Sequence, residues 1–258
     1  MFKPATTPQK TEAIIQDSLA LFISTWKPLS SLAFIVAFVS ILPNILIPEL
    51  NTEKGIQKFS DYLLLYFMGV IIFHNALLIQ LHRLMYGHQK LPMTQVVSVG
   101  FYKMLTVLLA SVLFAFAVGL GLFALILPGI VIVVRFFLYT PLIVIHNANI
   151  IDSFQTSYEL TKNHALQTLQ VMLIPVIAFF TSNLLVGIVL SIFQQLGVAS
   201  EGQLFNALLL LLQFLVAAVI TPFLYAFMLV QLHNLQLKAG TITPSNDDKN
   251  DNDKEFIA

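Results

Sequence analysis

The sequence predicts an all-α, polytopic integral membrane protein, and three observations carry that prediction. Of the 258 residues, 57% are hydrophobic and only 10% are charged, whereas an ordinary soluble domain has about 25% charged residues. The mean hydropathy is +0.84. Six apolar stretches approach or exceed the roughly 20 residues that a helix needs to cross a membrane. An ordinary soluble globular protein is excluded, because 13 basic and 13 acidic side chains are too few to cover its surface.

The expected membrane spans are spread along the middle of the chain. They are 29–47, 62–81, 104–127, 130–145, 169–193 and 204–232. The third and fourth are the hardest to divide, because the stretch from 104 to 145 carries a single charge. Pro128 and Gly129 within it are typical of a tight turn, so we expect two spans joined by a hairpin at that point. A re-entrant segment on either side of the turn is the alternative.

Two further segments have the pattern of amphipathic helices, which suits a membrane interface or the end of a helix bundle. The first is 11–26. The second is 152–167, for which we expect Asp152 as the N-cap. Its apolar side includes Ile151, Phe154 and Tyr158, and we expect the helix to pack on its own bundle rather than on a partner.

The chain therefore divides into three parts. Residues 1–28 form a cytoplasmic N-terminal amphipathic segment, and residues 29–238 form a membrane domain with six spans. Residues 239–258 are acidic and have almost no apolar side chains, so we expect a disordered tail. The first sustained apolar run begins near Leu29 without a cleavage pattern of the signal-peptide type, so we expect the first span to stay as an anchor.

The distribution of Lys and Arg predicts the orientation, because cytoplasmic loops carry an excess of both. If the two termini lie on one side, that side holds ten of the thirteen basic residues. The other side holds Lys54 and Lys58, and Arg135 lies inside a span. We therefore expect both termini in the cytoplasm, together with the loops around 82–103 and 146–168.

Several classes of function lack support in the residues. Without cysteine, the chain has no disulfide, no thiolate metal ligand and no cysteine nucleophile. Zero net charge without a basic block argues against nucleic-acid binding. No P-loop, G-x-S-x-G or H-E-x-x-H pattern is present, so we expect no metal, no cofactor and no enzymatic activity. No span has Asp or Glu near its centre, which weighs against an ion-driven carrier but not against a channel.

Arg135 is the one charge that we expect inside a span. An unpaired charge there costs at least about 2.5 kcal/mol, so its guanidinium needs a partner or a route to the headgroups. The candidate partners at the outer ends of neighbouring spans are Asp61, Glu49 and Glu201. One interpretation is a structural ion pair or a snorkelled anchor. The other is a contact to an anionic lipid headgroup or an anionic substrate.

A run of residues in the second half of the chain resembles a pattern found in bacterial membrane proteins. Its motif comprises Pro128, Gly129, Arg135, Pro141, Ser157, Leu160 and Thr161. Over about 127–164 the sequence resembles the YciC family of uncharacterised inner-membrane proteins, and elsewhere the similarity is one of hydropathy. The same pattern occurs in membrane domains attached to glycerophosphodiester phosphodiesterases, whose catalytic part is absent here. The resemblance implies a bacterial inner-membrane location and an unassigned function.

The expected function is that of a non-enzymatic envelope protein that handles lipid or plays an accessory role for other membrane proteins. The alternative is a transporter or channel for a small solute. Membrane lipids are the expected partners, and the sequence identifies no protein partner. Small residues four positions apart on the third and fifth spans are compatible with a homo-oligomer but do not establish one.

Overall fold

The structure of the protein, a computed structural model, describes residues 2–47, 52–196 and 202–242. The regular secondary structure of these residues is entirely helical. Its helices are α1 (Thr11–Leu46), α2 (Glu53–Met85), α3 (Met93–Ala124), α4 (Ile126–Phe136), α5 (Tyr139–Val144), α6 (Ile150–Thr161), α7 (Ala165–Gln195) and α8 (Gln203–Ala239). The acidic tail that we expected to be disordered lies almost entirely outside the described residues.

Six stretches among the described residues are long and apolar enough to cross a membrane, which confirms the predicted all-α membrane fold. Five are the single helices α1, α2, α3, α7 and α8, and the sixth, Ile126–Val144, combines α4 and α5. Large apolar side chains are exposed along them; Leu65, Phe180 and Leu211, for example, are 70%, 66% and 54% exposed. Such continuous apolar surface is stable in lipid rather than in water, so the chain is an integral membrane protein.

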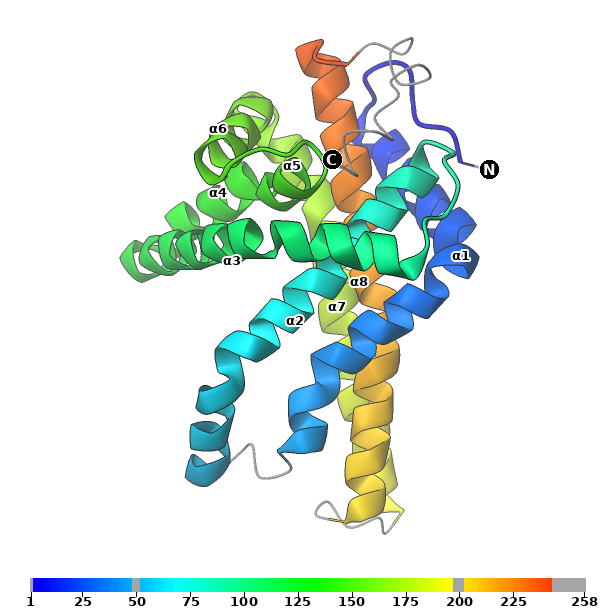
Figure 1. Ribbon diagram of the computed structural model, residues 1–258, viewed down its shortest axis with the longest axis vertical. Helices are drawn as coiled ribbons and strands as arrows, with labels where there is room; N and C mark the ends of the chain where they lie inside the picture. The colour runs from blue at the N-terminus through cyan, green and yellow to red at the C-terminus, as the bar shows by residue number, and fades with distance from the viewer. Residues whose placement is uncertain (1, 48–51, 197–201, 243–258) are drawn as a thin grey trace.

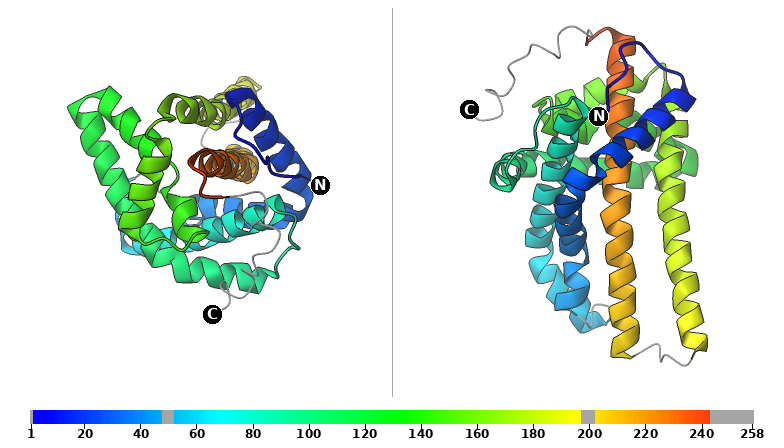
Figure 2. Two further views of the ribbon diagram at one scale, coloured as in Figure 1. Left: turned by 90° about the horizontal axis from the view of Figure 1, so that it is seen from above. Right: turned by 90° about the vertical axis from the view of Figure 1, so that its right-hand side faces the viewer.

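The buried core lies toward one end of the molecule, where the described parts of both chain termini also lie (Figures 1 and 2). The last turns of α2 and of α8 supply much of it, including the fully buried Leu77, Leu81 and Phe227. Toward the opposite end (Figure 1), α1, α2, α7 and α8 continue, and most of their side chains there are exposed or half-buried. The molecule thus has a packed head and a looser bundle of four long helices.

Helices α3 and α4 form a hairpin that runs across the long axis of that bundle (Figure 1). The right-hand view of Figure 2 shows α3 nearly end-on, while α7 and α8 extend lengthwise. Gly100 allows α3 to cross close against α2, because a Cβ at this position would lie 2.5 Å from the carbonyl oxygen of Ile72. The side-chain amide of Asn75 donates a hydrogen bond of 3.3 Å to the carbonyl of Gly100. A glycine and an amide therefore fix the transverse position of α3.

The hairpin turn is not where the sequence predicted it. Leu125 carries the turn, with extended backbone angles of φ −167° and ψ 151°, and Pro128 lies in the first turn of α4. Proline is tolerated there because the first N–H groups of a helix have no intrahelical partner. Gly129 instead serves packing, since a Cβ on it would meet the Leu122 side chain at 2.4 Å. The predicted fourth span is also interrupted, between α4 and α5.

Two predictions about the amphipathic segments need correction. The segment 11–26 is helical but is continuous with the first span in α1, and Pro28 lies inside that helix. Figure 2 shows α1 changing direction along its length, as a proline within a helix allows. In α6, the N-cap is Asn149 rather than Asp152, because the Asn149 side chain accepts from the Asp152 N–H at 2.9 Å. Asp152 stands three residues later, in the first turn.

Candidate functional site: a helix break and two grooves

The break between α4 and α5 is the first element of the candidate site. Pro141 causes it, because proline lacks an N–H and its ring collides with the carbonyl four residues earlier, that of Phe137. The chain makes a turn at Phe137 and Leu138 before α5 begins at Tyr139. A break in an apolar helix exposes backbone polar groups, which must find other partners if they are buried.

Side chains of α6 supply those partners. The Ser157 hydroxyl donates to the carbonyl of Arg135 at 2.8 Å and accepts from the N–H of Leu138 at 3.2 Å. The Thr161 hydroxyl donates to the same carbonyl at 3.1 Å. Both hydroxyl side chains are fully buried. Two residues spaced four apart on α6 therefore satisfy the backbone at the break and fix α6 against α4 and α5.

The Arg135 side chain joins the same interface. Its guanidinium Nη1 donates to the carbonyl of Thr161 at 2.6 Å, and Cζ lies 5.4 Å from the centroid of the Tyr158 ring. Thr161 is the last residue of α6, where the helix dipole favours a cation, and the ring adds a cation–π contact. Arg135 thus binds the C-terminal end of α6.

The partners considered for Arg135 from the sequence lie elsewhere or outside the described residues. Asp61 is exposed on α2, and Glu49 and Glu201 lie outside the part of the chain that the structure describes. Leu160 is 9% exposed and belongs to the core cluster. The motif residues from Arg135 to Thr161 thus come together around the α4–α5 break, where Arg135 donates to the carbonyl of Thr161, whereas Pro128 and Gly129 lie at the other end of α4, beside the hairpin turn.

A groove of about 760 Å³ lies between α3 and the connection from α5 to α6. Its polar lining includes Lys103, Asn147, Asn149 and Asp152, and its apolar lining includes Leu113, Ile143, Ile150 and Ile151. Lys103 Nζ donates to Asn147 Oδ1 across it. Asn147 has a positive φ of 54°, a left-handed conformation that Asn tolerates better than most residues. The groove therefore has charges of both signs beside an apolar wall.

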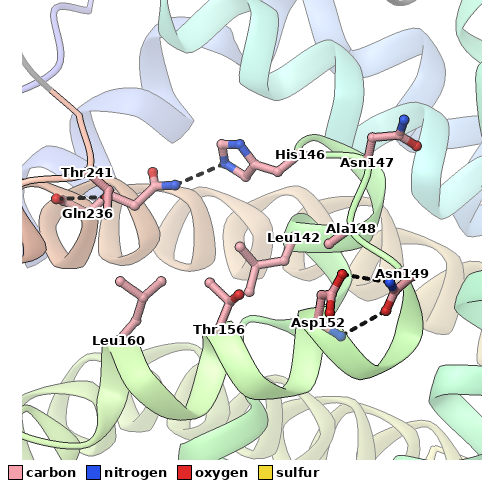
Figure 3. Close-up of a pocket in the computed structure, with 10 residues that line it drawn as sticks. All are labelled: Leu142, His146, Asn147, Ala148, Asn149, Asp152, Thr156, Leu160, Gln236 and Thr241. Atoms are coloured by element: carbon pink, nitrogen blue, oxygen red, sulfur yellow. Dashed lines mark hydrogen bonds between the residues drawn. The ribbon is translucent and has the colours of Figure 1, made fainter.

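A second groove of about 500 Å³ lies on the other side of the same connection (Figure 3). It shares Asn147, Ala148, Asn149 and Asp152 with the first groove. The end of α8 closes it, because Gln236 Nε2 lies 3.1 Å from His146 Nε2. Asn149 Nδ2 donates to Asp152 Oδ2 at 2.6 Å, which leaves the other carboxylate oxygen able to accept from a ligand. The α5–α6 connection is thus lined by grooves on both sides.

Sequence reasoning missed the role of this connection. Lys103 was only one of the ten basic residues counted on the side of the termini, and Asn147 and Asn149 were not considered. One signal was available: Asn149 stands three residues before Asp152 at the start of an amphipathic segment, the spacing of a reciprocal cap. The left-handed turn at Asn147 also has a local cause, since Asn is among the few residues that occupy it readily.

A buried polar layer at the end of α8 was missed as well. His233 belongs to this layer: it is 7% exposed, and both of its ring nitrogens have hydrogen-bond partners. Nδ1 lies 2.7 Å from the Tyr86 hydroxyl and Nε2 lies 2.8 Å from the Ala5 carbonyl. The neighbouring Asn234 Oδ1 accepts from the Gln9 N–H at 2.7 Å. These bonds hold the extended segment before α1 against α8. Among the described residues, no group of three or more His, Asp or Glu side chains could hold a metal ion.

These features define a helical integral membrane protein whose transverse hairpin is joined to its core through a broken helix. The chain belongs to a family described as a domain of unknown function, DUF7847, whose sequence profile matches residues 65–234. The match covers about two thirds of the chain and contains the hairpin, the break and nearly all residues that line the two grooves. No curated protein and no solved structure matches the chain.

Proposed function

We propose that this protein is a non-enzymatic membrane protein that holds a phospholipid headgroup in the groove between α3 and the α5–α6 connection. One observation carries the proposal: Lys103 and Asp152 line the same groove as a row of apolar side chains. A phospholipid has the matching chemistry, with a charged headgroup attached to acyl chains. The proposed lipid contact is therefore assigned to Lys103 instead of Arg135, because the guanidinium of Arg135 is bonded to α6.

The geometry of α3 supports this assignment. Leu113 lies ten residues after Lys103, which is about 15 Å along a helix, so the groove is long enough for a headgroup and the first part of an acyl chain. Lys103 is partly buried, and Asn147 orients its ammonium group. An ammonium group binds a phosphate through charge-assisted hydrogen bonds. The free carboxylate oxygen of Asp152 would accept from an amine, so a headgroup with both charges fits best.

The cellular location follows the same argument. We propose a bacterial inner membrane with both termini in the cytoplasm, because the basic residues are concentrated on the side of the termini. The groove would then face the cytoplasmic leaflet. The resemblance to the YciC family over about 127–164 supports this location, and it stays a prediction.

Native mass spectrometry of the protein extracted in lipid-polymer discs tests the proposal, with Lys103→Gln as the variant and Lys58→Gln as the matched control. Lys58 is an exposed lysine near the start of α2, away from the groove. We expect Lys103→Gln to reduce retention of an aminophospholipid such as phosphatidylethanolamine by about tenfold, the cost of one charge-assisted hydrogen bond. Lys58→Gln should retain it like the wild type.

Two results would overturn the proposal. One is equal lipid retention by Lys103→Gln and the wild type. The other is loss of the lipid in a stably folded Arg135→Leu variant while Lys103→Gln keeps it, which would return the site to Arg135. If no lipid is retained by any form, uptake of small solutes into proteoliposomes becomes the assay of choice, since it tests the transporter alternative.

A further inference from the structure

We propose that the α3–α4 hairpin does not cross the membrane but lies along it, within the leaflet on the side of the chain termini. The four long helices α1, α2, α7 and α8 would then be the ones that cross, and the surface of the hairpin would be covered by the lipids of one leaflet. This inference is independent of the proposed headgroup site, because it rests on the direction and composition of the hairpin.

The direction of the hairpin is the first observation. α7, α8 and the ends of α1 and α2 extend along the long axis of the molecule, and α3 and α4 run across it (Figures 1 and 2). If the four long helices cross the bilayer, their common direction is close to the membrane normal. A hairpin transverse to that direction lies parallel to the membrane surface.

The depth of the hairpin follows from the crossing with α2. α3 contacts α2 at Ile72. The last charged residue of α2 before this contact is Asp61, so the apolar part of α2 starts at Tyr62. The ten residues from Tyr62 to Ile72 rise about 15 Å, which is half of the roughly 30 Å thickness of the hydrocarbon. The crossing therefore lies about half-way across the bilayer, and the charge of Lys103 at the base of the hairpin favours the leaflet on the side of the termini, where the basic residues are concentrated.

The composition of the hairpin requires lipid around it. Between Lys103 and Arg135 no residue is charged. Large apolar side chains are exposed along the whole hairpin, among them Phe101, Leu109, Phe116 and Phe123, which is 93% exposed. The two flanking charges sit at the base of the hairpin, where Lys103 contacts Asn147 and Arg135 contacts Thr161. The hairpin is thus apolar except at its attachment to the core.

The composition and the backbone hydrogen bonding of the hairpin tip suit lipid better than water. Its six residues 122–127 are all apolar, whereas a turn on the far side of a membrane faces water and usually contains polar residues. The N–H of Leu125 is bonded to the carbonyl of Gly121 at 3.0 Å. Pro128 has no N–H to expose in the first turn of α4. Both features reduce the number of unpaired donors, which are costly in hydrocarbon.

Depth-dependent fluorescence quenching tests the proposal, because the chain contains one tryptophan, Trp26. A Trp26→Phe background receives a single new tryptophan at Phe101, Phe116 or Phe123, each of which is an exposed phenylalanine of α3. The variants are reconstituted in vesicles whose phospholipids carry bromine at shallow, intermediate or deep acyl positions. Phe116 and Phe123 lie about 22 Å and about 33 Å along the helix from Phe101.

A hairpin within one leaflet predicts the same depth for all three tryptophans, and therefore the same ratio of quenching by deep bromines to quenching by shallow ones. A crossing hairpin predicts shallow tryptophans in Phe101→Trp and Phe123→Trp and a deep tryptophan in Phe116→Trp. A ratio of deep to shallow quenching that is clearly higher for Phe116→Trp than for the other two variants would overturn the proposal.

Cysteine labelling gives an independent readout, because the chain has no native cysteine. Leu125→Cys reports the tip of the hairpin, and Lys58→Cys reports the opposite end of the long helices. We expect a membrane-impermeant maleimide to label Lys58→Cys from its own side and to leave Leu125→Cys unlabelled from that side. Labelling of both cysteines from the same side would also overturn the proposal.

Discussion

Replacing Gly100 by alanine tests the contact that fixes the hairpin against α2. The added Cβ would lie 2.5 Å from the carbonyl oxygen of Ile72 and 3.3 Å from the backbone nitrogen of Ala76. Carbon–oxygen contacts in packed helices are about 3.3–3.6 Å, so α3 and α2 must separate by up to about 1 Å. The obstacle is backbone, which cannot rotate away as a side chain can. Overpacking of this kind costs about 1–3 kcal/mol.

The separation also breaks the hydrogen bond from Asn75 to Gly100, which adds about 0.5–1.5 kcal/mol. The expected total loss in the free energy of unfolding is therefore about 1.5–4.5 kcal/mol, measured by reversible unfolding in mixed SDS–detergent micelles. Gly119→Ala is the matched control on the same helix, because a Cβ there has no atom within 4 Å. Alanine should stabilise that position by up to about 1 kcal/mol. Equal stability of the two alanine variants would refute the close crossing at Gly100.

Two further substitutions test the bonds around the site. Ser157→Ala leaves backbone groups at the α4–α5 break without their partner, so we expect a loss of about 1–3 kcal/mol in the same unfolding assay. Ser191→Ala, which removes only a bond to the serine's own helix, should change stability little. His233→Phe removes the ring bond to the Ala5 carbonyl, so limited trypsin digestion should release the N-terminal segment several-fold faster than in the wild type. His88→Phe, at an exposed histidine, is its control, and equal digestion rates in both variants would contradict the bond.

Hydropathy predicted most of the helices of this protein but not the direction of one pair. The expected spans 62–81, 169–193 and 204–232 each lie inside a single helix of the structure. A run of apolar residues shows that a segment is in lipid, and its length shows that it could cross. Neither property predicts that α3 crosses α2, because that crossing depends on the contact between Gly100 and the backbone of Ile72. That contact joins residues distant in sequence, so no local pattern reveals it.

The break at Pro141 illustrates the same limit at the candidate site. The sequence showed the proline, but it did not show that Ser157 and Thr161 would compensate for it. The sequence analysis predicted that Arg135, a charge within an apolar stretch, needs a partner. Its partner turned out to be a carbonyl at the end of a helix, and a search for acidic residues overlooks such a group. Unpaired backbone carbonyls are present at the C-terminal end of every helix, and no residue type identifies them in the sequence.

The orientation of α6 explains why its amphipathic pattern misled. The side that we considered apolar faces outward in part, because Ile151 is 76% exposed and Tyr158 is 43% exposed. The buried side consists of Ser153, Ser157 and Thr161, each fully buried and four residues apart. In water, a helix buries its large apolar side chains. Beside lipid, such side chains are stable on the outer surface of the protein. Small hydroxyl residues then allow close packing and hydrogen bonding between helices. A hydroxyl residue at every fourth position therefore marks the inner face of α6. Its exposed face combines Ile151 and Tyr158 with Asp152, Gln155 and Glu159, a mixture that suits the boundary between lipid and water.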